Sequence, residues 1–136
     1  MSRVKVSRAL RDGIIERACG CCEYCGASER FAAVGFHIEH IVALQHGGET
    51  DPENLALSCP ACNFRKGTNL SSVDPGTGAV VAVFHPRRDL WAAHFRRDKG
   101  EVVPLTATGR ATARLLGFNA PERVAEREFE RRVESS

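Results

Sequence analysis

The sequence predicts an α+β protein whose small first half is held together by metal-binding cysteines and whose second half is mostly helical. Two C-x2-C pairs, Cys22–Cys25 and Cys59–Cys62, enclose a segment that alternates like a β-strand. Apolar residues at helical spacing occur near the N-terminus and again in the last third of the chain. Together these patterns predict a strand, loop, strand and helix held by the cysteines, with an N-terminal helix before them and further helices after them.

Length and composition are those of a globular protein. The chain has 136 residues, of which 43% are hydrophobic and 26% charged, and this excludes wholesale disorder. No apolar run is long enough to cross a bilayer. The first residues, M-S-R-V-K-V, lack the apolar stretch of a signal peptide, so we expect a protein of the reducing cytoplasm. A net charge of +2 neither requires nor excludes a nucleic-acid partner, so function must be argued from local motifs.

A first helix is predicted over residues 7–18. Its apolar residues recur at every fourth position on one face, at Leu10, Ile14 and Ala18. Ser7 is a preferred N-cap residue. Further along, 36–44 alternates like a strand, and a turn with Gly47-Gly48 leads to a short extended segment at 54–58.

The next helix is predicted over 59–66, with Pro60 in its first turn and Gly67 at its end. After residue 70 the composition changes, and a loop is predicted over 71–78. The rest is expected to form a strand, a helix, an extended piece and two more helices, over 79–84, 87–96, 101–104, 106–116 and 119–133. We therefore divide the chain into a core, 1–70, and a C-terminal extension, 71–136, packed on it.

The cysteine spacing indicates a structural zinc site. A C-x2-C turn presents two thiolates about one tetrahedral edge apart, and two such turns complete a tetrahedral site of four thiolates. Disulfides are disfavoured in a reducing compartment, and a redox dithiol needs only one pair. Cys19 and Cys22 have the same spacing as Cys22 and Cys25, but Gly26 suits a tight turn after Cys25. The expected ligands are Cys22, Cys25, Cys59 and Cys62.

The motifs around these pairs resemble those of an HNH endonuclease with zinc-knuckle cysteines. They are C-E-Y-C-G at 22–26, I-E-H-I at 38–41, G-G at 47–48, N-L at 54–55, C-P-A-C-N at 59–63 and K-G at 66–67. The resemblance covers about residues 20–68. Segments of the tail, among them H-P-R-R at 85–88 and G-R-A-T at 109–112, also resemble the C-terminal part of one bacterial HNH subfamily.

This resemblance implies a ββα-metal fold, a divalent ion such as Mg²⁺ or Mn²⁺, and hydrolysis of a nucleic-acid phosphodiester. By position it implies that His40 is the general base that activates water. Glu39 and Asn63 are the implied metal ligands, and Asn54 braces the loop. The chemistry agrees, since an imidazole suits proton abstraction and carboxylate and amide oxygens suit a hard cation.

Strand geometry leaves an alternative open. Neighbouring residues of a regular strand face opposite ways, so Glu39 and His40 can share a site only at a strand end or a bulge. On a regular strand His37 would share the face of Glu39, which makes His37 the rival base or ligand. Without the motif, Asn54 reads as a turn residue and Asn63 as a helix cap.

Basic residues permit two interpretations as well. Arg65 and Lys66 either contact phosphate beside the site or form a solvated face. Arginines between 85 and 97 either form a DNA-contact surface or flank a core pair, Trp91 and Phe95. In the last helix, rows of arginine and glutamate predict a solvated, ion-paired face, with the arginines at 123, 127 and 131.

The leading functional hypothesis is a metal-dependent HNH endonuclease acting on DNA. The alternative is a zinc-stabilised nucleic-acid-binding module with weak or no catalysis, and a thiol redox protein is the remote third. The Glu39-His40 pair favours the nuclease, because a pure binding module needs no acid and base at one point.

Overall fold

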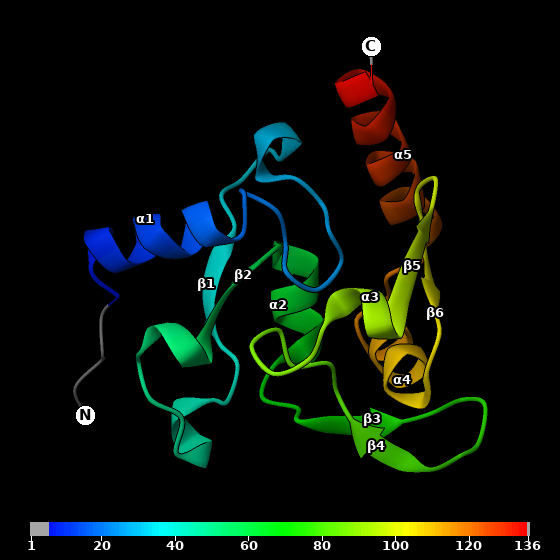
Figure 1. The fold of residues 1–136 in the computed structure, drawn as a ribbon, viewed down its shortest axis with the longest axis horizontal. Coiled ribbons are helices and arrows are strands. Elements are labelled where there is room, and N and C mark those ends of the chain that lie inside the picture. The colour runs from blue at the N-terminus through cyan, green and yellow to red at the C-terminus, as the bar shows by residue number, and fades with distance from the viewer. Residues whose placement is uncertain (1–5, 136) are drawn as a thin grey trace.

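The computed structural model describes residues 6–135 and is an α+β fold of five helices and three antiparallel strand pairs within that range (Figure 1). The helices are α1 (Arg8–Arg17), α2 (Pro60–Lys66), α3 (Trp91–His94), α4 (Ala107–Leu115) and α5 (Pro121–Ser135). The strands are β1 (His37–His40), β2 (Leu55–Ser58), β3 (Ser71–Val73), β4 (Val80–Ala82), β5 (Phe95–Asp98) and β6 (Glu101–Pro104). The first five residues, on which the cytoplasmic prediction rests, lie outside the described residues.

The predicted strand, strand and helix unit is confirmed. β1 pairs antiparallel with β2, from His37 opposite Ser58 to His40 opposite Leu55, and α2 packs against β1. Local chemistry starts and ends the helix: the Cys59 side chain caps its first turn, and Gly67 ends it at a φ of 52°.

β1 is shorter than the predicted strand over 36–44. After His40 the ladder stops, because the backbone N–H and C=O of Val42 both bond the side chain of Asn54. The carbonyl of Ile41 accepts a hydrogen bond from Lys66. After His40 these backbone groups are therefore paired with side chains and not with a neighbouring strand.

Helix α1 forms where it was predicted. The Ser7 hydroxyl accepts a hydrogen bond from the backbone N–H of Leu10, 3.1 Å away, and Ile14 is buried against the core. Near the helix end, Arg17 donates to the carbonyl oxygens of Pro52 and Leu55, at 2.9 and 2.7 Å, and so ties α1 to the start of β2.

The extension contains two β-hairpins, of which β4 and β6 lie within the predicted extended segments over 79–84 and 101–104, whereas their partners β3 and β5 were not predicted. β3 and β4 pair across a segment predicted as loop, and the predicted helix over 87–96 was wrong. Only α3 is helical there, and from Phe95 the chain pairs as β5 with β6. Gly100 in the connecting turn lies against α5, where a Cβ atom would meet the Val124 carbonyl oxygen at 2.1 Å. A long-range contact therefore decides the conformation of this segment.

The buried apolar residues form one cluster that draws on both halves of the chain. Tyr24 and Leu57 from the first half pack in the same cluster as Phe84 and Phe118 from the second. Phe95 is buried there, and its ring centroid lies 5.1 Å from that of Trp91. These two aromatic side chains belong to the core. The boundary after residue 70 remains our proposal. Within residues 6–135, no helix has both the length and the apolar character needed to cross a bilayer.

Candidate metal centre and active-site strand

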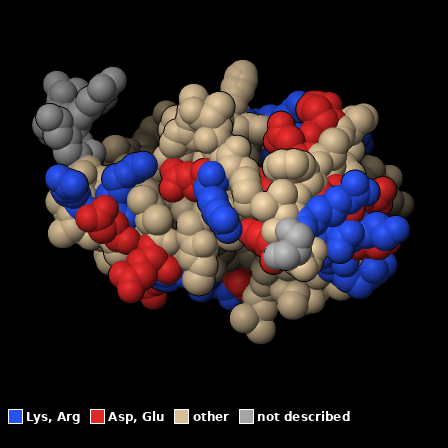
Figure 2. Space-filling model, turned by 90° about the horizontal axis from the view of Figure 1, so that it is seen from above, with Lys and Arg blue, Asp and Glu red and all other residues tan. Residues whose placement is uncertain are grey.

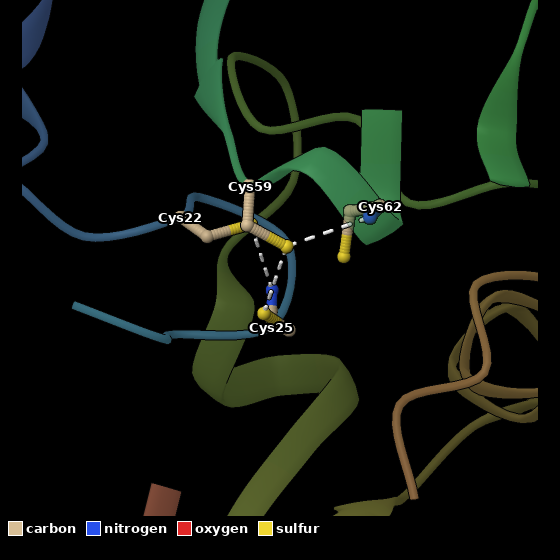
Figure 3. A group of neighbouring side chains, drawn as sticks. All are labelled: Cys22, Cys25, Cys59 and Cys62. Carbon is tan, nitrogen blue, oxygen red and sulfur yellow. Dashed lines mark hydrogen bonds between the residues drawn. The ribbon is translucent and has the colours of Figure 1, made fainter. Parts of the chain in front are cut away.

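The four predicted cysteines converge on one buried point (Figure 3). Cys22 and Cys25 come from the loop after α1, and Cys59 and Cys62 from the start of α2. Their Sγ atoms all lie within 4.8 Å of one another, and those of Cys25 and Cys59 are 3.8 Å apart. In a tetrahedral site with Zn–S bonds of about 2.3 Å, neighbouring sulfurs lie about 3.8 Å apart. The donor set and its spacing fit a structural zinc ion.

Backbone N–H groups orient the thiol groups within each knuckle. The N–H of Cys25 lies 3.5 Å from the Cys22 sulfur, and the N–H of Cys62 lies 3.4 Å from the Cys59 sulfur. Burial raises the pKa of the Cys22 thiol, whereas hydrogen bonds from the other thiols, Cys22 first, lower the pKa of Cys25. A metal ion that binds these sulfurs displaces the thiol protons.

The structure groups Cys22 with Cys25, and not with Cys19, in the four-cysteine cluster. Cys19 is exposed and lies outside the cluster, at a φ of 54°. All six cysteines are free thiols. Among residues 6–135, the four clustered cysteines are the one group of three or more His, Cys, Asp and Glu side chains placed to hold a metal ion.

Glu39 is buried between two partners that the sequence analysis did not foresee. It is 6% exposed, its Oε1 accepts a hydrogen bond from the Tyr24 hydroxyl, and its Oε2 lies 3.6 Å from the Lys66 ammonium. Oε2 has no hydrogen-bond donor among the described residues. Burial raises the pKa of Glu39, and Lys66 opposes the rise. Burial and the Glu39 carboxylate both raise the pKa of Tyr24.

The expectation that Lys66 contacts phosphate or lies on a solvated face was wrong. The side chain is 2% exposed and donates to the Ile41 carbonyl oxygen at 2.8 Å, so its ammonium does not face solvent where a phosphate would bind. A charge next to Glu39 offsets part of the cost of burying that carboxylate. Of the predicted pair, only Arg65 is exposed, and its guanidinium lies beside Gly117.

His40 is the last residue of β1, so the strand-end condition for a shared Glu39–His40 site is met. Its ring is half-buried, and Nε2 lies 2.8 Å from the Thr50 hydroxyl. His37, the rival residue, is exposed at the opposite end of the same strand. Asn63 is half-buried in the middle of α2.

Asn54 makes three hydrogen bonds to the loop that follows His40. Its Oδ1 accepts from the Val42 N–H at 2.9 Å, and its Nδ2 donates to the carbonyl oxygens of Val42 and Glu49, at 3.0 and 2.8 Å. Gly48 lies against the same turn, where a Cβ atom would meet the Val42 carbonyl oxygen at 1.8 Å. The side chain of Asn54 therefore fixes the loop that carries Thr50, the partner of His40.

Residues 22–69 match the family model described as HNH endonuclease. The chain carries an HNH domain. The matched range contains both cysteine pairs and all of β1, β2 and α2, and the four-cysteine cluster fits an HNH domain of the zinc-knuckle type. No curated protein and no solved structure matched the chain.

Figure 2 shows a group of lysine and arginine side chains at the right of the view from above, with acidic side chains at its margins and elsewhere on the same face. Of the predicted arginine cluster, Arg87 is half-buried and pairs with Glu23, whereas Arg96 and Arg97 are exposed on β5. The expectation of a solvated arginine row on the last helix was wrong for two members, because Arg123 and Arg127 are buried.

Proposed function

We propose that the chain is an endonuclease that hydrolyses phosphodiester bonds of DNA with the help of a divalent ion, Mg²⁺ or Mn²⁺. The observation that carries this proposal is the HNH match, which spans the strand, loop, strand and helix bearing all the candidate residues. A bound cation would neutralise charge that develops on the transferring phosphoryl group.

His40 is the proposed general base. The contact between Nε2 and the Thr50 hydroxyl holds the ring in one orientation, and in the tautomer whose Nε2–H donates, Nδ1 carries the lone pair that accepts a proton from water. Asn54 is a positioning residue in this scheme, because its three hydrogen bonds fix the loop between His40 and Thr50.

Glu39 and Asn63 are the proposed ligands of the divalent ion. Oε2 of Glu39 suits this role because it is buried without a hydrogen-bond donor among the described residues. Asn63 would add a neutral amide oxygen, a donor type that hard cations accept. Arg65 is the proposed phosphate contact, because it is exposed on the same helix as Asn63.

One observation favours the alternative, a zinc-stabilised nucleic-acid-binding module with weak or no catalysis. The ammonium of Lys66 lies 3.6 Å from the same Oε2 that a divalent ion would need. Lys66 therefore competes with the metal for Glu39, and this competition weakens metal binding.

Digestion of a supercoiled plasmid by the purified, zinc-loaded protein separates the two proposals. We expect cleavage that requires Mg²⁺ or Mn²⁺ and falls by about 10²- to 10⁴-fold in His40→Ala. Glu39→Gln should regain part of its activity at raised divalent ion, since the lost group binds metal. Zinc content and melting temperature, measured on each variant, show that the fold is intact.

His37→Ala is the matched control, because His37 is exposed on the same strand. It should cleave like the wild type. If His37→Ala abolishes cleavage and His40→Ala does not, the site assignment is wrong. Metal-independent DNA binding without cleavage by the wild type would refute the nuclease and support the binding module.

A further inference from the structure

A fifth side chain reaches the cysteine cluster from outside the HNH domain. Arg123 is on α5 and is 8% exposed, and its Nη2 lies 3.0 Å from the Cys62 sulfur and 3.6 Å from the Cys59 sulfur. Both distances are within reach of an N–H···S hydrogen bond. The guanidinium is therefore in contact with one whole knuckle.

The other nitrogen of the guanidinium is held by the end of α4. Nη1 of Arg123 donates to the carbonyl oxygens of Leu116 and of Gly117, the latter at 3.0 Å. Carbonyl oxygens at a helix C-terminus carry partial negative charge and favour a cation. The planar fork of arginine can serve carbonyls on one side and sulfurs on the other, which a lysine ammonium cannot do with the same geometry.

The charge of the site explains why a buried cation belongs there. Four thiolates around Zn²⁺ carry a net charge of −2, and such a charge is costly to bury unless it is paired. Arg123 supplies one compensating charge in direct contact. Arg127, one turn along α5, is also buried and donates to the carbonyl oxygens of Gly100 and Phe118.

We propose that Arg123 is a positioning residue of the zinc site, which stabilises the thiolates of Cys59 and Cys62 and slows release of the metal. Through it the C-terminal extension becomes part of the site. Binding of zinc and docking of α5 are then coupled, and each favours the other by the same free energy. This proposal rests on the cysteine cluster holding zinc and does not depend on nuclease activity.

Transfer of zinc from the full-length protein to an excess of a chromogenic chelator, under native conditions, tests the proposal. Loss of an outer-shell partner typically lowers metal affinity about 10- to 100-fold, so Arg123→Met should release zinc at least about tenfold faster. Arg131→Met is the matched control, because Arg131 is on the same helix, is exposed and pairs with Glu128. It should release zinc at the wild-type rate.

The Co²⁺-substituted protein gives a second readout that loosened packing would not move. Loss of N–H···S donation raises the energy of the sulfur lone pairs, so the thiolate-to-cobalt charge-transfer band of Arg123→Met should shift to lower energy. An unshifted band, or zinc release at the wild-type rate, overturns the proposal. If Arg123→Met does not fold, Arg123→Lys and Arg123→Gln decide. The charged lysine must release zinc more slowly than the neutral glutamine, and equal rates overturn the proposal.

Discussion

Replacement of Lys66 by methionine is the sharpest test of how the HNH strand is held. The two side chains have similar length, so the change removes the ammonium next to Glu39 and leaves the packing largely intact. With 3.6 Å between Nζ and Oε2, the Coulomb attraction is about 4 to 5 kcal/mol at an effective dielectric constant of about 20. Breaking a buried pair by removing one partner typically costs about 3 to 5 kcal/mol, because the other charge stays buried. We expect Lys66→Met to lose stability in that range.

Urea unfolding at pH 7 measures this loss, and a double-mutant cycle with Glu39→Gln isolates the pair. The double variant should recover most of the stability, because no unpaired charge remains. In Lys66→Met the folded pKa of Glu39, already raised by burial, rises further. The penalty is then present above the folded pKa and disappears as the pH falls below the unfolded value of about 4.3. Equal urea midpoints for Lys66→Met and the wild type, or strictly additive effects in the cycle, would refute this reasoning.

Three further outcomes follow from the described contacts. Cys59→Ser should lose its zinc and unfold the HNH domain, because structural zinc contributes folding energy directly. Metal content and circular dichroism measure both effects, and a metal-free protein with the native melting curve would contradict this prediction. In the zinc-loaded protein, iodoacetamide should label exposed Cys19 before half-buried Cys21, because burial is the main cause of a raised pKa at Cys21. Mass spectrometry should find the four knuckle cysteines unmodified, and their rapid labelling would count against the zinc site. Hydrogen bonds from Arg110 are the main cause of the lowered pKa of Asp74. The ionised carboxylate therefore stabilises the fold above its unfolded pKa of about 3.9, and this contribution is lost as the pH falls through the folded pKa. Asp74→Asn should therefore melt at a lower temperature than the wild type at pH 7, with a smaller difference at pH ~3, and an equal difference at both pH values would be evidence against that ion pair.

Local sequence signals were sufficient where local chemistry decides the structure. The predicted helix ends are confirmed at Ser7, Pro60 and Gly67, because caps and φ preferences act within a few residues. The C-x2-C spacing predicted which four cysteines converge, because each such turn places its two thiol groups side by side.

The missed features depend on partners far away in the sequence. Phe95 begins a strand because β6 pairs with it, and the periodicity of Trp91 and Phe95 alone is equally compatible with a helix. Lys66 and Arg123 look like surface residues in the sequence. Their burial follows from a carboxylate and from thiolates that only the folded chain brings to them. Charge patterns along a helix cannot show such partners.

The indole of Trp91, the only tryptophan of the chain, donates to the backbone carbonyl of Tyr24 at 2.8 Å and lies against the Phe95 ring at an interplanar angle of 37°. One ring therefore touches both the first zinc knuckle and the extension. Its fluorescence emission will shift to longer wavelength when water reaches the indole, that is, when knuckle and extension separate. The protein thus carries an intrinsic optical reporter, and a stopped-flow mixing experiment with a chelator can time that separation without any added label.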